Sequence, residues 1–288
     1  MRRRLGWCIV AAMSQATTRR TYARPLRLGL RRGLARLLRR AWRALLRAPF
    51  AVRVLVGALA LVAAWAVANW IVQAARKPAE MLFPVSGALA KTPEETWRRY
   101  GPLFRLHSTA RISPELLAAL AQVEGAGNPA AHTYWTWRLS WNPFEVYRPA
   151  SSAVGMYQIT DPAFRDARRL CVHDHAVVED GPWYDPGSCW FNALYTRVLP
   201  THAIEMTSAS LDRAVAARLA RRAATPAQAE DLAAVAHLCG GAAADGYARR
   251  GFRVAPGQRC GEHDLRGYLA RLNALKREFV RLAKEKKS

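Results

Sequence analysis

The chain has 288 residues, about half of them apolar, so it is long enough to bury a substantial core and is not a large disordered protein. Its net charge of +23 is concentrated at the N-terminal end. Residues 1–53 hold 15 arginines and no acidic residue, whereas residues 54–288 hold 29 basic and 21 acidic side chains. Because the arginines adjoin an apolar run, we do not interpret the charge as a specific nucleic-acid site.

Residues 1–53 are expected to form a basic cytoplasmic arm. Leucine and arginine are mixed at helical spacing over residues 28–46, which suits an amphipathic helix on an anionic membrane surface. An unstructured tail is the alternative. No specific nucleic-acid partner is expected. Any arginine-rich peptide binds polyanions, so such binding by the arm would not indicate a specific site.

Residues 54–75 carry no charge over 22 positions. A helix of that length crosses a hydrocarbon core of about 30 Å, so we expect a single transmembrane helix. The arginines before it predict a cytoplasmic N-terminus and a periplasmic C-terminal part at a bacterial inner membrane. A buried core helix and a cleaved signal peptide are the alternatives. The length of the run argues against both, and its distance from Met1 argues against the second.

Residues 76–92 contain Pro78, Pro84 and Gly87 and are predicted to be a periplasmic tether. Residues 93–288 have mainly helical patterning, so the expected fold class is mainly α. A helix is predicted to begin after Thr92, where Pro93 suits the first turn and Glu95 completes a capping box.

Four cysteines follow the predicted membrane helix, and an even number in an exported region favours two disulfides. Three pairings are possible. We favour Cys171–Cys189 and Cys239–Cys260, because each closes a short loop rich in glycine, proline and polar residues. A zinc site is the alternative, but no Cys-x-x-Cys spacing supports it, so neither metal nor cofactor is expected.

The segment that carries chemistry runs from Ser113 to Glu124. Ser113 suits a helix cap, Pro114 the first helical position, and Leu117, Leu120 and Glu124 share one helix face. Glycine and proline then end the helix. Glu124 is therefore expected at the edge of the core, where desolvation raises the pKa of a carboxyl group enough for it to act as a general acid. A solvent-facing glutamate is the alternative.

An aromatic-rich stretch follows within fourteen residues: Tyr134, Trp135, Trp137, Trp141, Phe144 and Tyr147. Aromatic rings with polar tips stack on sugars and also hydrogen-bond. Asn142, Pro143, Arg148 and Pro149 break regular structure in and just after this stretch, which favours a loop over a buried helix. We expect Trp135 and Trp137 to line a sugar-binding wall, with core packing as the alternative.

Glu124 at the end of an apolar helix, followed by Gly155-Met156-Tyr157-Gln158-Ile159, resembles the soluble lytic transglycosylase family, which is related to goose-type lysozyme. The resemblance covers residues from about 110 to 250. The family usually has serine where this chain has Gly125, and a shorter gap between the two motifs. Its third motif, Ala-Tyr-Asn-x-Gly, has a counterpart only in Ala236-His237-Leu238-Cys239-Gly240.

The resemblance implies a lysozyme-like helical domain over 93–288 that cleaves the β-1,4 bond between N-acetylmuramic acid (MurNAc) and N-acetylglucosamine (GlcNAc), leaving a 1,6-anhydro end. Glu124 would act as acid and then base. Gly155, Met156, Tyr157 and Gln158 would line the sugar site. His237 would stand where a tyrosine supports the catalytic glutamate, or would be a core histidine.

The implied partners are peptidoglycan glycan strands, the inner membrane and possible envelope machinery. Two alternative functions stay open: a hydrolytic muramidase, and a non-catalytic peptidoglycan-binding or scaffold module of an envelope-spanning complex. A hydrolase usually needs a second carboxylate, for which the candidates are Glu145, Asp161 and Asp166.

Overall fold

The computed structural model describes the whole chain except residues 1–35, 38, 83–85, 183, 186 and 286–288. Most of the predicted cytoplasmic arm therefore lies outside the described residues. The chain divides into two compact units, residues 1–66 and 67–288. The division falls inside the predicted membrane span.

The structure is mainly helical, as predicted. Among the described residues, 36–37 and 39–47 are helical, inside and just after the predicted amphipathic segment. The helices with described bounds are α2 (Phe50–Arg76), α4 (Pro93–Leu106), α5 (Pro114–Gly125), α6 (Asp161–Ala167), α7 (Pro200–Leu219), α8 (Pro226–Arg249) and α9 (Leu265–Glu285). The described part of the chain also contains three short 3-10 helices: η1 (Pro78–Leu82), η2 (Gly87–Leu89) and η3 (Trp190–Leu194).

In the residues that the structure describes, the strands form three small antiparallel hairpins. They are β1 (Trp135–Trp137) with β2 (Tyr147–Pro149), β3 (Leu170–His173) with β4 (Ala176–Glu179), and β5 (Arg259–Cys260) with β6 (His263–Asp264). Trp135 pairs with Pro149, Leu170 with Glu179 and Arg259 with Asp264.

Helix α2 contains the predicted span 54–75 in one continuous helix of 27 residues. It is long and apolar enough to cross a membrane, and its most apolar window is not buried in the protein. This part of the sequence prediction is confirmed at the level of a candidate membrane helix.

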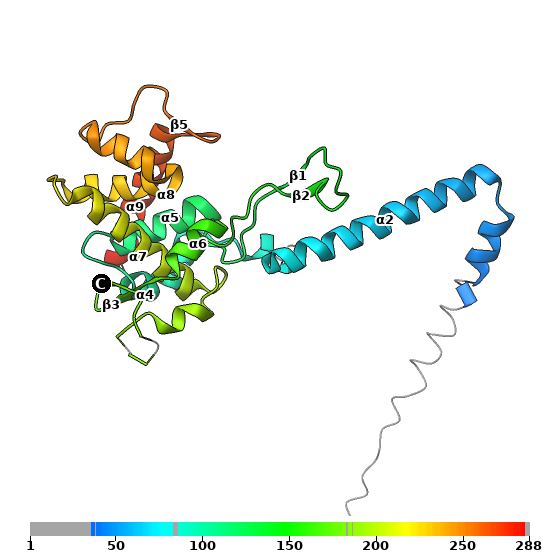
Figure 1. Cartoon of the computed structure of the whole chain (residues 1–288), viewed down its shortest axis with the longest axis horizontal. Coiled ribbons are helices and arrows are strands. Elements are labelled where there is room, and N and C mark those ends of the chain that lie inside the picture. Colours follow the sequence, from blue (N-terminus) through cyan, green and yellow to red (C-terminus); the bar gives the residue numbers. More distant parts are fainter. Residues whose placement is uncertain (1–35, 38, 83–85, 183, 186, 286–288) are drawn as a thin grey trace, which may run out of the picture. The chain divides into compact units, whose positions relative to one another are not determined.

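The core of the second unit is organised around α5. Residues 116–121 of this helix are completely buried, and α4, α7 and α9 pack against it. Trp97 of α4 contacts Phe279 of α9 with ring centroids 5.6 Å apart. In Figure 1, α5 lies among the other helices while the β1–β2 hairpin projects away from them. A central helix with all sides covered has only its ends available for a site.

The predicted helix starts are confirmed. Thr92 forms a capping box with Glu95, and the Ser113 side chain accepts a hydrogen bond from the Leu116 amide. Both helices have proline in the first turn. These short-range contacts satisfy amide groups that a helix leaves without partners at its N-terminus.

Residues 76–92 differ from the predicted tether. They contain η1 and η2, and the Lys77, Glu80 and Ser86 side chains are buried in the second unit. Glu80 is fully buried, and its charge is compensated by two partners. Lys77 forms an ion pair with it at 2.9 Å, and the Trp135 Nε1–H donates to its carboxylate at 3.1 Å. The described residues of this segment, 76–82 and 86–92, thus include polar side chains that are packed in the second unit.

The four cysteines after α2 form the two disulfides that the short loops between them predicted. Cys171 and Cys189 form one disulfide, with Cα atoms 5.5 Å apart, and Cys239 and Cys260 form the other, with Cα atoms 5.2 Å apart. Two disulfides are typical of a protein in an oxidising compartment.

Candidate active site

Glu124 lies in the last turn of α5, where the helix emerges from the core. Its side chain is half-buried, and the helix ends just beyond it as Ala126 takes a left-handed conformation with φ of 49°. The Tyr268 hydroxyl donates a hydrogen bond of 2.6 Å to Glu124 Oε1. One carboxylate oxygen is thereby fixed by a donor from the protein.

Tyr268 comes from α9, 144 residues away in the sequence. Burial, followed by the Glu124 charge and its hydrogen bond, raises the pKa of Tyr268 far above its ordinary value. The hydroxyl therefore stays protonated and acts only as a donor to Glu124. The transferable proton of a protonated Glu124 would then be carried by Oε2.

The sequence prediction missed Tyr268. It shares a buried face of α9 with Leu265, Leu269 and Leu272, at spacings of three and four. A tyrosine in an otherwise aliphatic helix face predicts a buried hydrogen bond, because a buried hydroxyl usually finds a partner. The sequence does not say which partner.

A cavity of about 240 Å³ opens beside Glu124. Its lining brings together Glu124, Gln158 of the second motif and His237, and these residues span more than one hundred positions of the chain. The lining residues are Glu124, Gln158, Ile159, Thr160, Ala163, Ala167, Met206, Thr207, Ser210, Leu211, His237 and Leu238.

The Gly155–Gln158 segment forms a tight turn between Val154 and Ile159, which pair with each other. Gly155 has φ of +82°, and a Cβ atom there would lie 2.3 Å from the Arg197 carbonyl oxygen. Gln158 is also left-handed, with φ of 48°, and its Nε2 donates to the Gly155 carbonyl oxygen at 2.9 Å. The turn thus presents Gln158 to the cavity.

Met156 and Tyr157 are completely buried and lie outside the cavity lining, as does Gly155. The Tyr157 hydroxyl donates to the Leu117 carbonyl oxygen of α5 at 3.0 Å. Burial raises the pKa of Tyr157 well above its ordinary value. These residues hold the turn against α5, and Gln158 is the member of the motif that reaches the cavity.

Gly125, which follows Glu124, lies too close to the neighbouring turn to carry a side chain. A Cβ atom on Gly125 would lie 2.8 Å from Met156 Cα and 3.0 Å from the Met156 carbonyl oxygen. Both are backbone atoms, so neither can rotate away. The turn carrying Gln158 therefore packs directly on the end of α5, and glycine is required for that contact.

His237 lies in the cavity lining, close to a break in α8 where Gly240 has φ of 77°. The hydrogen bond to Glu124 comes from Tyr268 instead, and among the described residues no hydrogen bond joins His237 to Glu124. The side chain is half-buried. His237 is thus a wall residue of the cavity in this structure.

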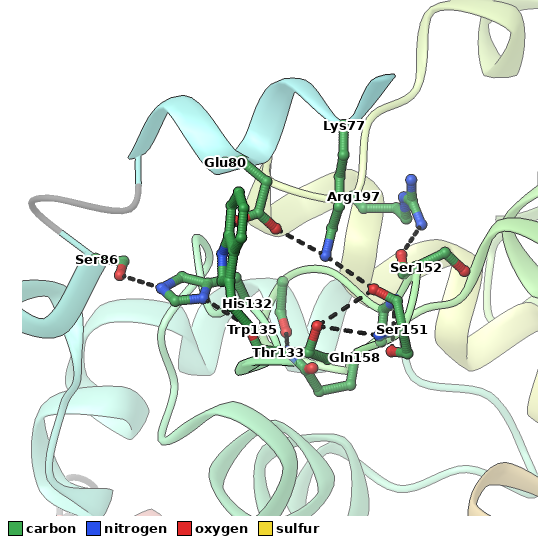
Figure 2. Close-up of polar contacts among 12 residues, drawn as sticks. Lys77, Glu80, Ser86, His132, Thr133, Trp135, Ser151, Ser152, Gln158 and Arg197 are labelled. Atoms are coloured by element: carbon green, nitrogen blue, oxygen red, sulfur yellow. Dashed lines mark hydrogen bonds and ion pairs between the residues drawn. The ribbon is translucent and has the colours of Figure 1, made fainter. Parts of the chain in front are cut away.

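Trp135 and Trp137 do not line the Glu124 cavity. Trp135 donates to the buried Glu80, and Trp137 stacks on Tyr147 with ring centroids 4.5 Å apart. Figure 2 shows Trp135 beside Glu80 and Lys77 in a polar network that also includes His132 and Ser151. The expected sugar-binding wall is therefore part of a separate structural element.

A second, larger cavity of about 690 Å³ adjoins the first, and Leu238 lines both. It lies between the base of the aromatic stretch and the β5–β6 hairpin, with Tyr134, Arg259, Glu262 and His263 in its lining.

The other candidate carboxylates are engaged elsewhere. Asp161 pairs with Arg197 at 2.7 Å, Glu145 pairs with Arg76 at 3.6 Å, and Asp166 lines a different cavity. Within the described lining of the first cavity, Glu124 is the acidic side chain.

No protein-family model matches the chain, and neither a curated protein nor a solved structure is significantly similar to it.

Proposed function

We propose that this chain is a membrane-anchored peptidoglycan lytic transglycosylase that cleaves the MurNAc-β-1,4-GlcNAc bond and leaves 1,6-anhydroMurNAc ends. The observation that supports this most strongly is the half-buried carboxyl group of Glu124, held by Tyr268 beside a cavity that Gln158 and His237 also line. The motif fragments that resemble the family meet at this one carboxylate.

In the proposed reaction, Glu124 Oε2 donates its proton to the glycosidic oxygen as the bond to the MurNAc C1 breaks. The GlcNAc unit leaves with a hydroxyl group at C4, and the MurNAc acetamido oxygen stabilises the cation at C1. Glu124, now a carboxylate, accepts the proton of the C6 hydroxyl, and O6 closes on C1. Protons and electrons balance without water or a second carboxylate.

The Tyr268 hydroxyl contributes orientation. Because it occupies Oε1 as a donor in both charge states of Glu124, Oε2 is the oxygen that gives and regains the proton. A fixed carboxyl group loses less entropy on reaching the reactive geometry, which lowers the barrier. The pairing of Asp161 with Arg197 favours this route over a hydrolase with paired carboxylates.

We further propose that α2 anchors the chain in a bacterial inner membrane with a cytoplasmic N-terminus and a periplasmic domain. The arginine-rich residues before the span support this orientation, as do the two disulfides after it. The domain would act on glycan strands on the periplasmic side.

The experiment uses the full chain in detergent with purified sacculi and mass spectrometry of the soluble products. The wild type should release 1,6-anhydro-muropeptides, and Glu124→Gln should lower the rate by about 10²–10⁴-fold, the range of general acid–base catalysis. Glu115→Gln is the matched control, because Glu115 lies on the same helix but outside the cavity lining.

Products with reducing ends would identify a muramidase instead. Sacculus binding with no turnover by either the wild type or Glu124→Gln would identify the wall-binding or scaffold alternative. Full activity in Glu124→Gln would refute the assignment of the acid/base.

A further inference from the structure

The tip of the β1–β2 hairpin (residues 135–149) exposes large apolar side chains close together. Leu139 and Trp141 are fully exposed, at 107% and 105%, and Trp137 is 66% exposed. Isolated exposed hydrophobic residues are ordinary on a protein surface, but a cluster of this kind marks a contact with a partner or a membrane.

The hairpin is held by the C-terminal turns of α2. Asn69 Nδ2 donates to the Tyr147 carbonyl oxygen at 2.7 Å, and Gln73 Nε2 donates to the Phe144 carbonyl oxygen at 2.5 Å. Asn69, Gln73 and Arg76 follow one another at spacings of four and three, so they share one helix face. Both amide side chains are buried by this contact.

The network continues to the base of the hairpin. Lys77 Nζ donates to the Ser151 carbonyl oxygen at 3.2 Å and pairs with Glu80, which accepts from Trp135 Nε1 (Figure 2). Contacts at both ends of the hairpin fix its position on the last turns of α2 and the segment that follows them.

These contacts also determine how far along the predicted membrane span the hairpin lies. Asn69 and Gln73 lie inside the charge-free run 54–75, and Asn69 precedes Arg76 by seven residues, which is about 10 Å along a helix that rises 1.5 Å per residue. A hairpin bonded to Asn69 therefore lies level with the outer end of the span. Non-helical backbone is tolerated at that depth only when its polar groups have partners, and the two amide side chains supply donors to the carbonyl oxygens of Phe144 and Tyr147.

We propose that the β1–β2 hairpin is a second membrane contact, which inserts Trp137, Leu139 and Trp141 into the outer interface of the phospholipid bilayer beside the membrane helix. Tryptophan favours the membrane–water interface. Arg138 and Arg148 lie within the same hairpin and can meet lipid phosphates, while its acidic residue, Glu145, is paired with Arg76.

This inference rests on the membrane anchorage in the proposed function, but not on the glycan chemistry. It also explains the aromatic stretch without a role in the Glu124 cavity, whose lining contains none of the three apolar tip residues. A glycan-binding wall is the competing explanation, and the two are separated by which partner the tip responds to.

The test uses the full chain with Cys8→Ser and Leu139→Cys, labelled with the environment-sensitive fluorophore NBD and reconstituted in phosphatidylcholine/phosphatidylglycerol vesicles. The control carries Leu194→Cys, at another strongly exposed leucine of the same unit. The label at residue 139 should show blue-shifted emission and lose most of its intensity when lipids with a shallow doxyl quencher are included. The label at residue 194 should keep its intensity.

Equal, weak quenching at the two positions would overturn the proposal. A label at residue 139 that ignores the quencher lipid but responds to soluble glycan strands would also overturn it, in favour of the glycan wall. Alkaline carbonate extraction tests the anchorage separately, since release of the protein would refute both the membrane helix and this contact. Quenching in Glu124→Gln should equal that in the wild type, even if the enzymatic assignment fails.

Discussion

Removal of one hydroxyl group tests how strongly the protein holds the Glu124 carboxylate. Tyr268→Phe keeps the buried ring and deletes the 2.6 Å hydrogen bond to Oε1. A hydrogen bond to a charged group contributes about 1.5–3 kcal/mol to stability. One kcal/mol shifts the melting temperature of a domain of this size by about 2–4 °C, so Tyr268→Phe should lower Tm by about 3–12 °C.

Two other buried tyrosines serve as comparisons for the Tm shift expected of Tyr268→Phe. Tyr157→Phe deletes a 3.0 Å bond to a neutral carbonyl oxygen, which contributes about 0.5–1.5 kcal/mol, so its Tm should fall by about 1–6 °C. Tyr247 is buried, and its burial near Asp231 raises its pKa to about 12, but its hydroxyl has no hydrogen bond among the described residues. Tyr247→Phe should leave Tm nearly unchanged.

The assay is differential scanning fluorimetry of the full chain in one detergent at pH 7.5, with sacculus turnover measured on the same samples. Tyr268→Phe should also lower the turnover rate, whereas Tyr247→Phe should not. Equal Tm shifts in the three variants would refute the idea that the acceptor's charge sets the energy. Normal turnover by Tyr268→Phe would refute the orienting role.

Three further perturbations probe the supports of the site and the fold. Gly155→Ala should destabilise the protein by about 1–3 kcal/mol through a collision with the Arg197 carbonyl oxygen, whereas Gly251→Ala, also at positive φ but in open space, reports the backbone strain alone. Burial lowers the pKa of His107 despite the nearby Glu205, so the unfolded chain binds a proton at this histidine more readily than the folded chain does. Tm should therefore fall as the pH drops below about 6.5. A Tm that does not depend on pH in that range would contradict this expectation. Reduction of the two disulfides, which close loops of 18 and 21 residues, should cost about 3 kcal/mol each in the chain-entropy description, and an unchanged Tm after complete thiol titration would argue against it.

The sequence by itself determined the features that depend on neighbouring residues. The caps at Thr92 and Ser113, the apolar helix containing residues 54–75 and the position of Glu124 in the last turn of α5 all follow from local patterns. The short loops between cysteines likewise led to the pairs that the structure joins. Such features are local because helix capping, amphipathic spacing and short loop closure involve few intervening residues.

Only the tertiary structure decided which distant groups meet. The donor to Glu124 is Tyr268 rather than His237, because α9 packs on α5 and places its own buried hydroxyl there. Likewise, Trp135 donates a hydrogen bond to the buried Glu80 and does not line the Glu124 cavity. Glu80 comes from the segment that the sequence predicted to be a tether, so this contact ties part of that segment to the folded unit. Contacts of this kind depend on how whole helices pack and how buried polar groups find partners, and no local pattern in the chain encodes either.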